Sequence, residues 1–156
     1  MCGIIIFGCV PPSTETSISD VEQYKYDEEC EDYPPCNVML SIAAEDWRGH
    51  HWREAIDNYD KLFKCRCTEI KNSAGEIYKY LGYSYRQLGL YDSAAYIFDQ
   101  GLKFIQEDIE LLEYAGENAG KHNKIEKQIY YYDKILSIEE NNPKVLEELS
   151  NVYRDQ

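Results

Sequence analysis

Apolar residues recur at helical spacing through most of the chain. In one stretch they fall in two sets, at Tyr78, Leu81 and Tyr85 and then at Ala94, Phe98 and Leu102. Steps of three and four residues place such side chains on one face of an α-helix. The segment QLGLYD between the sets supplies a Gly that can end one helix and Asp92, which can cap the next. The pattern predicts two antiparallel helices joined by a tight turn.

The same pattern repeats along the chain. The segment IYKYLGYSYRQLGLYDSAAYIFDQGLKF aligns with LLEYAGENAGKHNKIEKQIYYYDKILSI, so that Gly82 falls on Gly116 and Phe98 on Tyr132, each 34 residues apart. The spacing continues to Leu146, and a looser copy precedes these units by 39 residues, with its extra residues in CRCTEIKNS. A period of this length predicts stacked helical hairpins, that is, an all-α solenoid. A non-repeating helical bundle is the alternative.

These residues resemble the tetratricopeptide repeat (TPR). The resemblance is most specific at Tyr78, Leu81-Gly82, Tyr85, Gly89, Ala94, Phe98 and Gly101-Leu102. It implies a right-handed α-solenoid over residues 36–156, with units at about 36–74, 75–108 and 109–142 and a capping helix at 143–156. The capping helix needs a polar outer face to end the stack.

The resemblance also implies a function, because the first helices of TPR units line a concave groove that holds an extended or helical peptide. We therefore expect a non-catalytic scaffold that binds a protein or peptide. By register, the expected groove residues are Trp47, Glu76, Lys79, Tyr83, Arg86, Glu110, Glu113, Glu117, Lys121, Asn151 and Arg154. Trp47, Tyr83 and Arg86 are of the types that carry most interface energy. Glu110, Glu113 and Glu117 would form an acidic stripe that attracts a basic partner.

One binding mode of the family is not expected here. Family members that hold chaperone tails clamp a carboxylate with Lys and Asn at defined groove positions. This chain has Leu40, Ala44, Tyr80, Glu110 and Tyr114 at those positions.

The N-terminal segment MCGIIIFGC resembles the end of a bacterial lipoprotein signal. Ile6, Gly8 and Cys9 fit a lipobox, although Phe7 is bulkier than usual and a basic region is missing. Residues 10–35 are acidic and rich in Pro, Ser and Thr, as in a solvated tether. We expect a lipid on Cys9 and a place in the bacterial cell envelope, facing the periplasm. The alternative is a soluble cytoplasmic adaptor with an incidental apolar N-terminus.

A distant alternative is an enzyme. The start MCGI resembles the glutamine amidotransferases that use an N-terminal nucleophile, in which the thiol of Cys2 would attack and its own amine would act as base. Such an enzyme needs a large α/β domain, and only about 35 residues precede the repeats. We therefore expect no catalysis.

Four further cysteines suggest disulfides. Cys36 should begin the first helix, and Cys65 and Cys67 should follow the second, so Cys36 can bridge to either and Cys30 can take the other. An oxidising compartment would favour these bonds. The spacings C-x-C and C-x5-C lack the two-residue interval usual in zinc sites. His50-His51 forms no metal motif either. We expect no metal and no cofactor.

The net charge argues against two classes of binding partner, nucleic acid and anionic lipid. The formal net charge is −13, which disfavours nucleic acid because a phosphate backbone requires clustered Lys and Arg. It also disfavours electrostatic binding to anionic lipid. Fifteen Tyr against four Phe suit half-exposed packing and binding surfaces. The sequence leaves the oligomeric state open.

Overall fold

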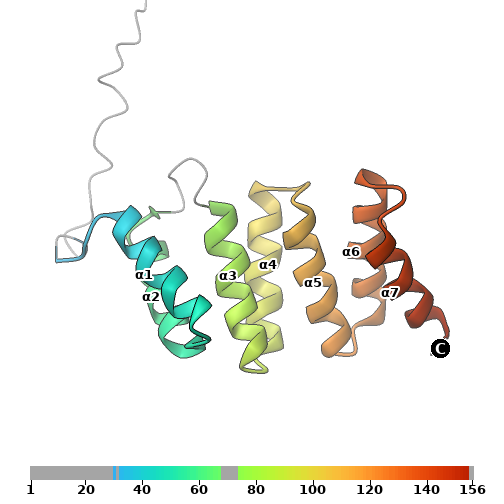
Figure 1. Ribbon diagram of the computed structural model, residues 1–156, viewed down its shortest axis with the longest axis horizontal. Helices are drawn as coiled ribbons and strands as arrows, with labels where there is room; N and C mark the ends of the chain where they lie inside the picture. Colours follow the sequence, from blue (N-terminus) through green and yellow to red (C-terminus); the bar gives the residue numbers. More distant parts are fainter. Residues whose placement is uncertain (1–29, 31, 68–73, 155–156) are drawn as a thin grey trace, which may run out of the picture.

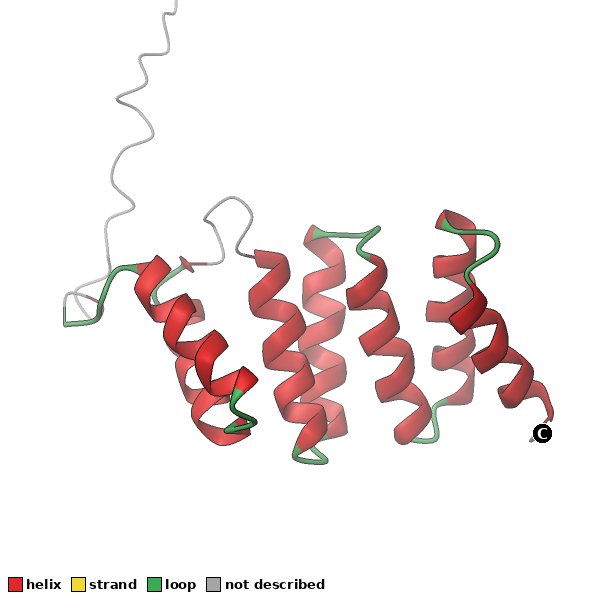
Figure 2. Cartoon of the chain, in the orientation of Figure 1, coloured by secondary structure: helices red, strands yellow, loops and turns green. Residues whose placement is uncertain are grey.

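The computed structural model describes residues 30, 32–67 and 74–154, and their regular structure is helical throughout (Figure 2). In chain order the helices are α1 (Cys36–Arg48), α2 (Trp52–Lys64), α3 (Ala74–Gln87), α4 (Tyr91–Phe104), α5 (Ile109–Lys121), α6 (Ile125–Ile138) and α7 (Pro143–Arg154). None of the helices in these residues is long and apolar enough to cross a membrane.

Consecutive helices form three hairpins, α1/α2, α3/α4 and α5/α6, which stack side by side. Figure 1 shows two layers, with α1, α3, α5 and α7 in front and α2, α4 and α6 behind. Helix α7 packs against α6 at the end of the stack. The structure thus confirms the all-α solenoid that the repeat predicts, and it excludes the non-repeating bundle.

The three hairpin turns share one backbone conformation. His50, Gly89 and Asn123 occupy equivalent places and all have positive φ angles, of 61°, 74° and 54°. In the second turn the N–H of Leu90 donates to the carbonyl of Tyr85, five residues earlier, and the other two turns have the same bond. This geometry satisfies carbonyls at the end of the first helix, and it costs least with Gly or Asn in the left-handed position.

The start of α4 differs from the prediction that Asp92 would cap this helix. Asp92 does not cap α4: Leu90 occupies the N-cap, and Asp92 lies in the first turn, where its charge still favours the helix dipole. Asp108 does cap a helix, because its Oδ1 accepts a hydrogen bond of 2.9 Å from the N–H of Leu111 in α5.

Within each of the last two hairpins an aromatic ring lies directly against a glycine. A Cβ added to Gly82 would come within 2.3 Å of the Phe98 ring, and one added to Gly116 within 2.5 Å of the Tyr132 ring. Both rings are buried. The two helices approach as closely as they do because these glycines have no side chain.

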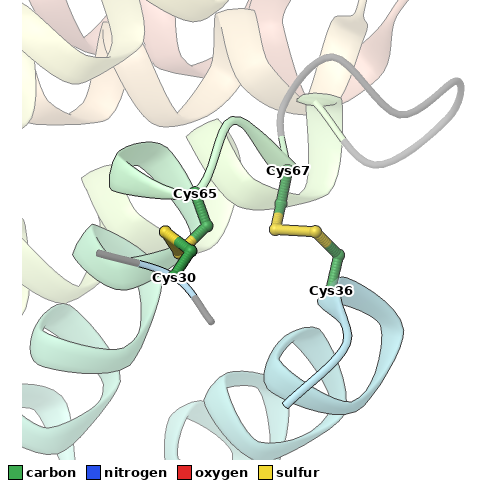
Figure 3. The surroundings of a disulfide bond; sticks show 4 residues. All are labelled: Cys30, Cys36, Cys65 and Cys67. Carbon is green, nitrogen blue, oxygen red and sulfur yellow. A yellow bond between two sulfur atoms is a disulfide. The ribbon is translucent and has the colours of Figure 1, made fainter. Parts of the chain in front are cut away.

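Two disulfides close the N-terminal end of the stack (Figure 3). Cys30 is bonded to Cys65 across 35 residues, and Cys36 to Cys67 across 31 residues. Of the pairings that the sequence left open, the structure therefore has Cys36 with Cys67 and Cys30 with Cys65. They join the segment before α1 and the start of α1 to the residues that follow α2.

Removing these bonds should destabilise the chain. A loop of 31 or 35 residues predicts about 3–4 kcal/mol for either bond formed alone, chiefly by restricting the unfolded chain. Because the two loops overlap, the second bond adds less than the first. Dithiothreitol should lower the melting temperature of the wild type, measured by circular dichroism. The fourfold variant Cys30→Ser, Cys36→Ser, Cys65→Ser, Cys67→Ser should melt at the lower temperature with or without reductant. Equal melting of the oxidised and reduced wild type would contradict the two bonds.

Candidate functional site: the first-helix face

The first helices carry a row of aromatic side chains, which Trp52 at the start of α2 extends. We call this set the aromatic row: Trp47, Trp52, Tyr80, Tyr83 and Tyr114. The ring centroids of Trp47 lie 4.4 Å from Tyr80 and 5.5 Å from Tyr83. Those of Tyr83 lie 5.6 Å from Trp52 and 5.2 Å from Tyr114. Every member is partly exposed. We call the side of α1, α3, α5 and α7 that bears this row the first-helix face.

Arg86 on α3 contacts aromatic rings of both α3 and α5 and so links the two helices within the aromatic row. Its guanidinium lies 4.6 Å from the centroid of the Tyr83 ring and 5.6 Å from that of Tyr114, and it is paired with the Glu117 carboxylate. The side chain is only 5% exposed. Cation–π contacts and a charge-assisted hydrogen bond together fix its position. The sequence predicted an open contact residue at Arg86, whereas the structure buries it beneath the aromatic rings.

The three glutamates of the expected acidic stripe all have cationic partners. Lys79 Nζ lies 2.7 Å from Glu110, and Lys144 Nζ lies 2.8 Å from Glu113 and 3.1 Å from Glu117. The stripe is therefore neutralised within the face by α3 and α7 and is not an open acidic surface. The sequence register placed these residues on one side of α5 but did not show which cations stand opposite.

The ion pairs change the titration of the carboxyl groups. Burial alone would raise the pKa of Glu117, but hydrogen bonds from Arg86 and Lys144 outweigh it and hold that pKa below its usual value. Burial would also raise the pKa of Glu110, but hydrogen bonds from Lys79 and Tyr114 outweigh it and hold that pKa below its usual value. Both groups therefore stay ionised at neutral pH.

The other expected groove residues lie at the margins. Glu76 is partly exposed in the first turn of α3, and Lys121 is exposed in the last turn of α5. Arg154 donates a hydrogen bond of 2.7 Å to the Asn151 side chain near the end of α7.

A hollow of about 560 Å³ opens beside Tyr80, at the edge of the first-helix face. Its walls come from the start of α3, from Phe104 at the end of α4 and from the turn that follows, which begins at Ile105. The Phe104 ring stacks on Tyr78 at 5.8 Å and is otherwise largely exposed. Glu76 and Lys79, two of the expected groove residues, line this hollow. Phe104 and Ile105 were not predicted from the sequence, because they follow the repeat motif at the end of the unit. Residues 32–67 and 74–154 contain no group of three side chains arranged to hold a metal.

Comparison with known proteins identifies the fold. No family model and no curated protein matches the chain. The first TPR domain of Spaghetti superimposes with a TM-score of 0.68 at 17% identity, covering 77% of this chain and 91% of that one. The Arabidopsis OM64 TPR domain gives 0.67 at 13%, covering 78% and 96%. A TPR protein from Parabacteroides merdae gives 0.68 at 14%, covering 76% and 45%. The chain therefore has the fold of TPR domains.

The buried Arg86–Glu117 pair should matter more to stability than an exposed pair. Arg86→Met leaves Glu117 with one cation and opens space under two rings. We therefore expect the free energy of unfolding, measured with urea, to fall by about 3 kcal/mol. The matched control is Lys127→Met, which breaks an exposed pair with Asp99 and should cost less than about 1 kcal/mol. If Arg86→Met and Lys127→Met lower the free energy of unfolding equally, the structural role of Arg86 is contradicted.

The same pair predicts an acid dependence of stability. Since the folded pKa of Glu117 is lowered, its contribution is complete above the unfolded carboxyl pKa and is lost as pH falls through the folded value. Glu117→Gln should therefore be less stable than the wild type at pH 7, and the difference should shrink in acid. A constant difference down to pH 3 would show that the charge on Glu117 contributes nothing.

Proposed function

We propose that the chain is a non-catalytic scaffold that binds a peptide segment of a partner protein along the first-helix face. The observation that carries the proposal is the aromatic row, which remains partly exposed while Arg86 and its partners hold it in place. Large rigid aromatic side chains give much contact area at a small loss of conformational entropy. Such residues dominate binding energy in protein interfaces.

Related folds support this class of partner. The Spaghetti domain was solved bound to the HSP90 peptide SRMEEVD, and a yeast Sti1 domain in a complex with pHSP90. An acidic tail is not the segment that we propose for this chain. The Lys and Asn that would clamp it are replaced, among other changes, by Tyr80, Glu110 and Tyr114, and the net charge of −13 repels it.

The segment that fits is neutral or basic and carries an apolar or aromatic side chain. Because Lys79, Arg86 and Lys144 already neutralise the acidic stripe, contact with the aromatic row supplies most of the affinity. The net charge of −13 adds a weaker preference for basic flanking residues. The hollow beside Tyr80 can receive one bulky side chain of the bound segment.

The proposal can be tested with peptides selected from a random display library on the full chain. Both tryptophans of the sequence, Trp47 and Trp52, belong to the aromatic row, so their fluorescence should report binding directly. Tyr83→Ala should weaken the selected peptides by roughly 30-fold, as expected for a central aromatic contact. The matched control is Tyr96→Ala, an exposed tyrosine on α4 in the other layer, which should leave affinity unchanged.

Failure would be clear in this design. If the selected peptides bind Tyr83→Ala as tightly as the wild type, or if Tyr96→Ala weakens them instead, the binding site is not the aromatic row. A selection that yields no peptide with saturable binding would also count against the proposal.

We further propose that the chain is tethered to a bacterial envelope membrane through a lipid on Cys9. Cys9 and residues 1–29 lie outside the part of the chain that the structure describes, so the proposal rests on the lipobox-like sequence. The two disulfides support it indirectly, since such bonds persist in an oxidising compartment such as the periplasm. A soluble cytoplasmic adaptor is the alternative.

The mass of the mature N-terminal peptide, from protein purified out of the native membrane fraction, separates these possibilities. A lipid-modified Cys9 as the first residue is the expected result. An unmodified start at Met1 in the soluble fraction would remove the tether. A free Cys2 as first residue would favour the amidotransferase, and a glutaminase assay on that mature chain would then decide.

A further inference from the structure

The aromatic row offers hydrogen-bond donors as well as rings. The hydroxyl groups of Tyr80 and Tyr83 and the indole N–H of Trp52 form no hydrogen bond within residues 32–67 and 74–154, and none of the three is buried. The hydroxyl of Tyr114 differs, because it donates to Glu110. A ligand that lies on the row therefore meets aromatic rings together with three donors that can bond to it.

Acceptors are scarcer on the same face. Both carboxylate oxygens of Glu110 and both of Glu117 already accept hydrogen bonds from side chains of the face. One oxygen of Glu113 is bonded as well, to Lys144 of α7. A peptide N–H group that loses water on this face without finding an acceptor weakens binding. The face therefore favours a ligand whose backbone accepts hydrogen bonds and donates few.

A proline-rich segment matches this imbalance. Proline has no N–H group to leave unpaired. In the polyproline II conformation the carbonyls have no partner within the segment, so they can accept from hydroxyl and indole donors. Proline-rich segments dock on aromatic-lined surfaces, and their conformation forms before binding, so little entropy is lost. An α-helical ligand bonds its own carbonyls and would leave the donors of the row unpaired beneath it.

The length of the row suits one turn of such a segment. The ring centroid of Tyr83 lies 5.6 Å from that of Trp52 and 5.2 Å from that of Tyr114. One turn of polyproline II has three residues and is roughly 9 Å long. Arg86 contacts both tyrosine rings and is itself buried, so the rings are held in place before a ligand arrives.

We propose that the peptide bound by the first-helix face is a proline-rich segment in the polyproline II conformation, with a Lys or Arg beside the prolines. This proposal rests on the proposed function and names the chemical class of its ligand. Glu76 lies one helical turn before Tyr80, is partly exposed and forms no ion pair within residues 32–67 and 74–154. Its carboxylate can pair with the basic residue, and the net charge of −13 favours the same sign.

The prolines of the chain itself fit the row poorly. The sequence has two proline pairs, Pro11-Pro12 and Pro34-Pro35, and both belong to the acidic segment 10–35. This segment has eight acidic residues and one lysine. Because the whole chain is strongly acidic, repulsion disfavours this segment as the ligand, whether it comes from the same molecule or from a second copy. The charge therefore points to a segment of another protein.

The probe is a fluorescein-labelled peptide of six prolines with two lysines at each end, added to the full chain and followed by fluorescence anisotropy. We expect saturable binding. One control peptide contains D-proline, which keeps the composition and charge and reverses the handedness of the helix. A second control has six alanines, which keep their N–H groups. Both controls should bind at least tenfold more weakly.

Chain variants separate the contacts. Tyr83→Phe keeps the ring and removes the hydroxyl donor, so it should weaken the proline peptide about fivefold. Tyr96→Phe, on α4 in the other layer, is the matched control and should leave the affinity unchanged. Glu76→Gln should weaken the same peptide about threefold, and this loss should vanish when the lysines of the peptide are replaced by glutamine.

Three results would overturn the proposal. The first is equal binding of the L-proline and D-proline peptides. The second is a set of library-selected peptides that lack proline yet depend on Tyr83; the proposed function would then stand without this ligand class. The third is tighter binding of the probe by the Pro11→Ala, Pro12→Ala chain, because the chain's own segment would then be the occupant. If no peptide of any composition depends on Tyr83, the proposed function fails as well.

Discussion

The contact of an aromatic ring with a glycine inside the α3/α4 and α5/α6 hairpins is the constraint on which the rest of the structure depends. Phe98 lies against Gly82 and Tyr132 against Gly116 at distances that leave no space for a Cβ. This contact sets how closely the two helices of a unit approach. Because the spacing recurs with the repeat, successive first helices stand side by side in one layer with a regular offset (Figure 1). A surface that runs across several helices is the result.

That offset explains why the first-helix face holds together. Residues on neighbouring first helices meet when they are 31 positions apart, three fewer than the repeat, as in Lys79–Glu110, Arg86–Glu117 and Glu113–Lys144. Tyr83 and Tyr114 obey the same rule. The cations of α3 and α7 thus neutralise the carboxylates of α5 between them, and the aromatic rings form a continuous row. Although the chain is strongly acidic, we propose that this face binds its partner through aromatic contact area more than through charge.

Periodicity was sufficient to predict the fold, since the apolar positions and the glycines at Gly82 and Gly116 specify helical hairpins by themselves. It also predicted Trp47 and Tyr83 on one side of the first helices, and in the structure their rings lie next to each other. It could not predict the burial of Arg86 or the pairing of the acidic stripe, because a register within one helix says nothing about the offset between helices. The disulfide connectivity was likewise open, since Cys65 and Cys67 lie two residues apart and both are near the start of α1. The capping role of α7 was inferred from its place at the end, whereas its exposed Leu146 and Tyr153 emerge only from the packing.

The central claim is that the first-helix face is the peptide-binding surface. The most direct test is a map of backbone amide chemical-shift changes in the full, isotope-labelled chain on addition of a library-selected peptide. The account predicts that the largest changes fall on α1, α3 and α5 around Trp47, Tyr80, Tyr83 and Tyr114. Changes concentrated on α2, α4 and α6, with these four residues unaffected, would contradict it.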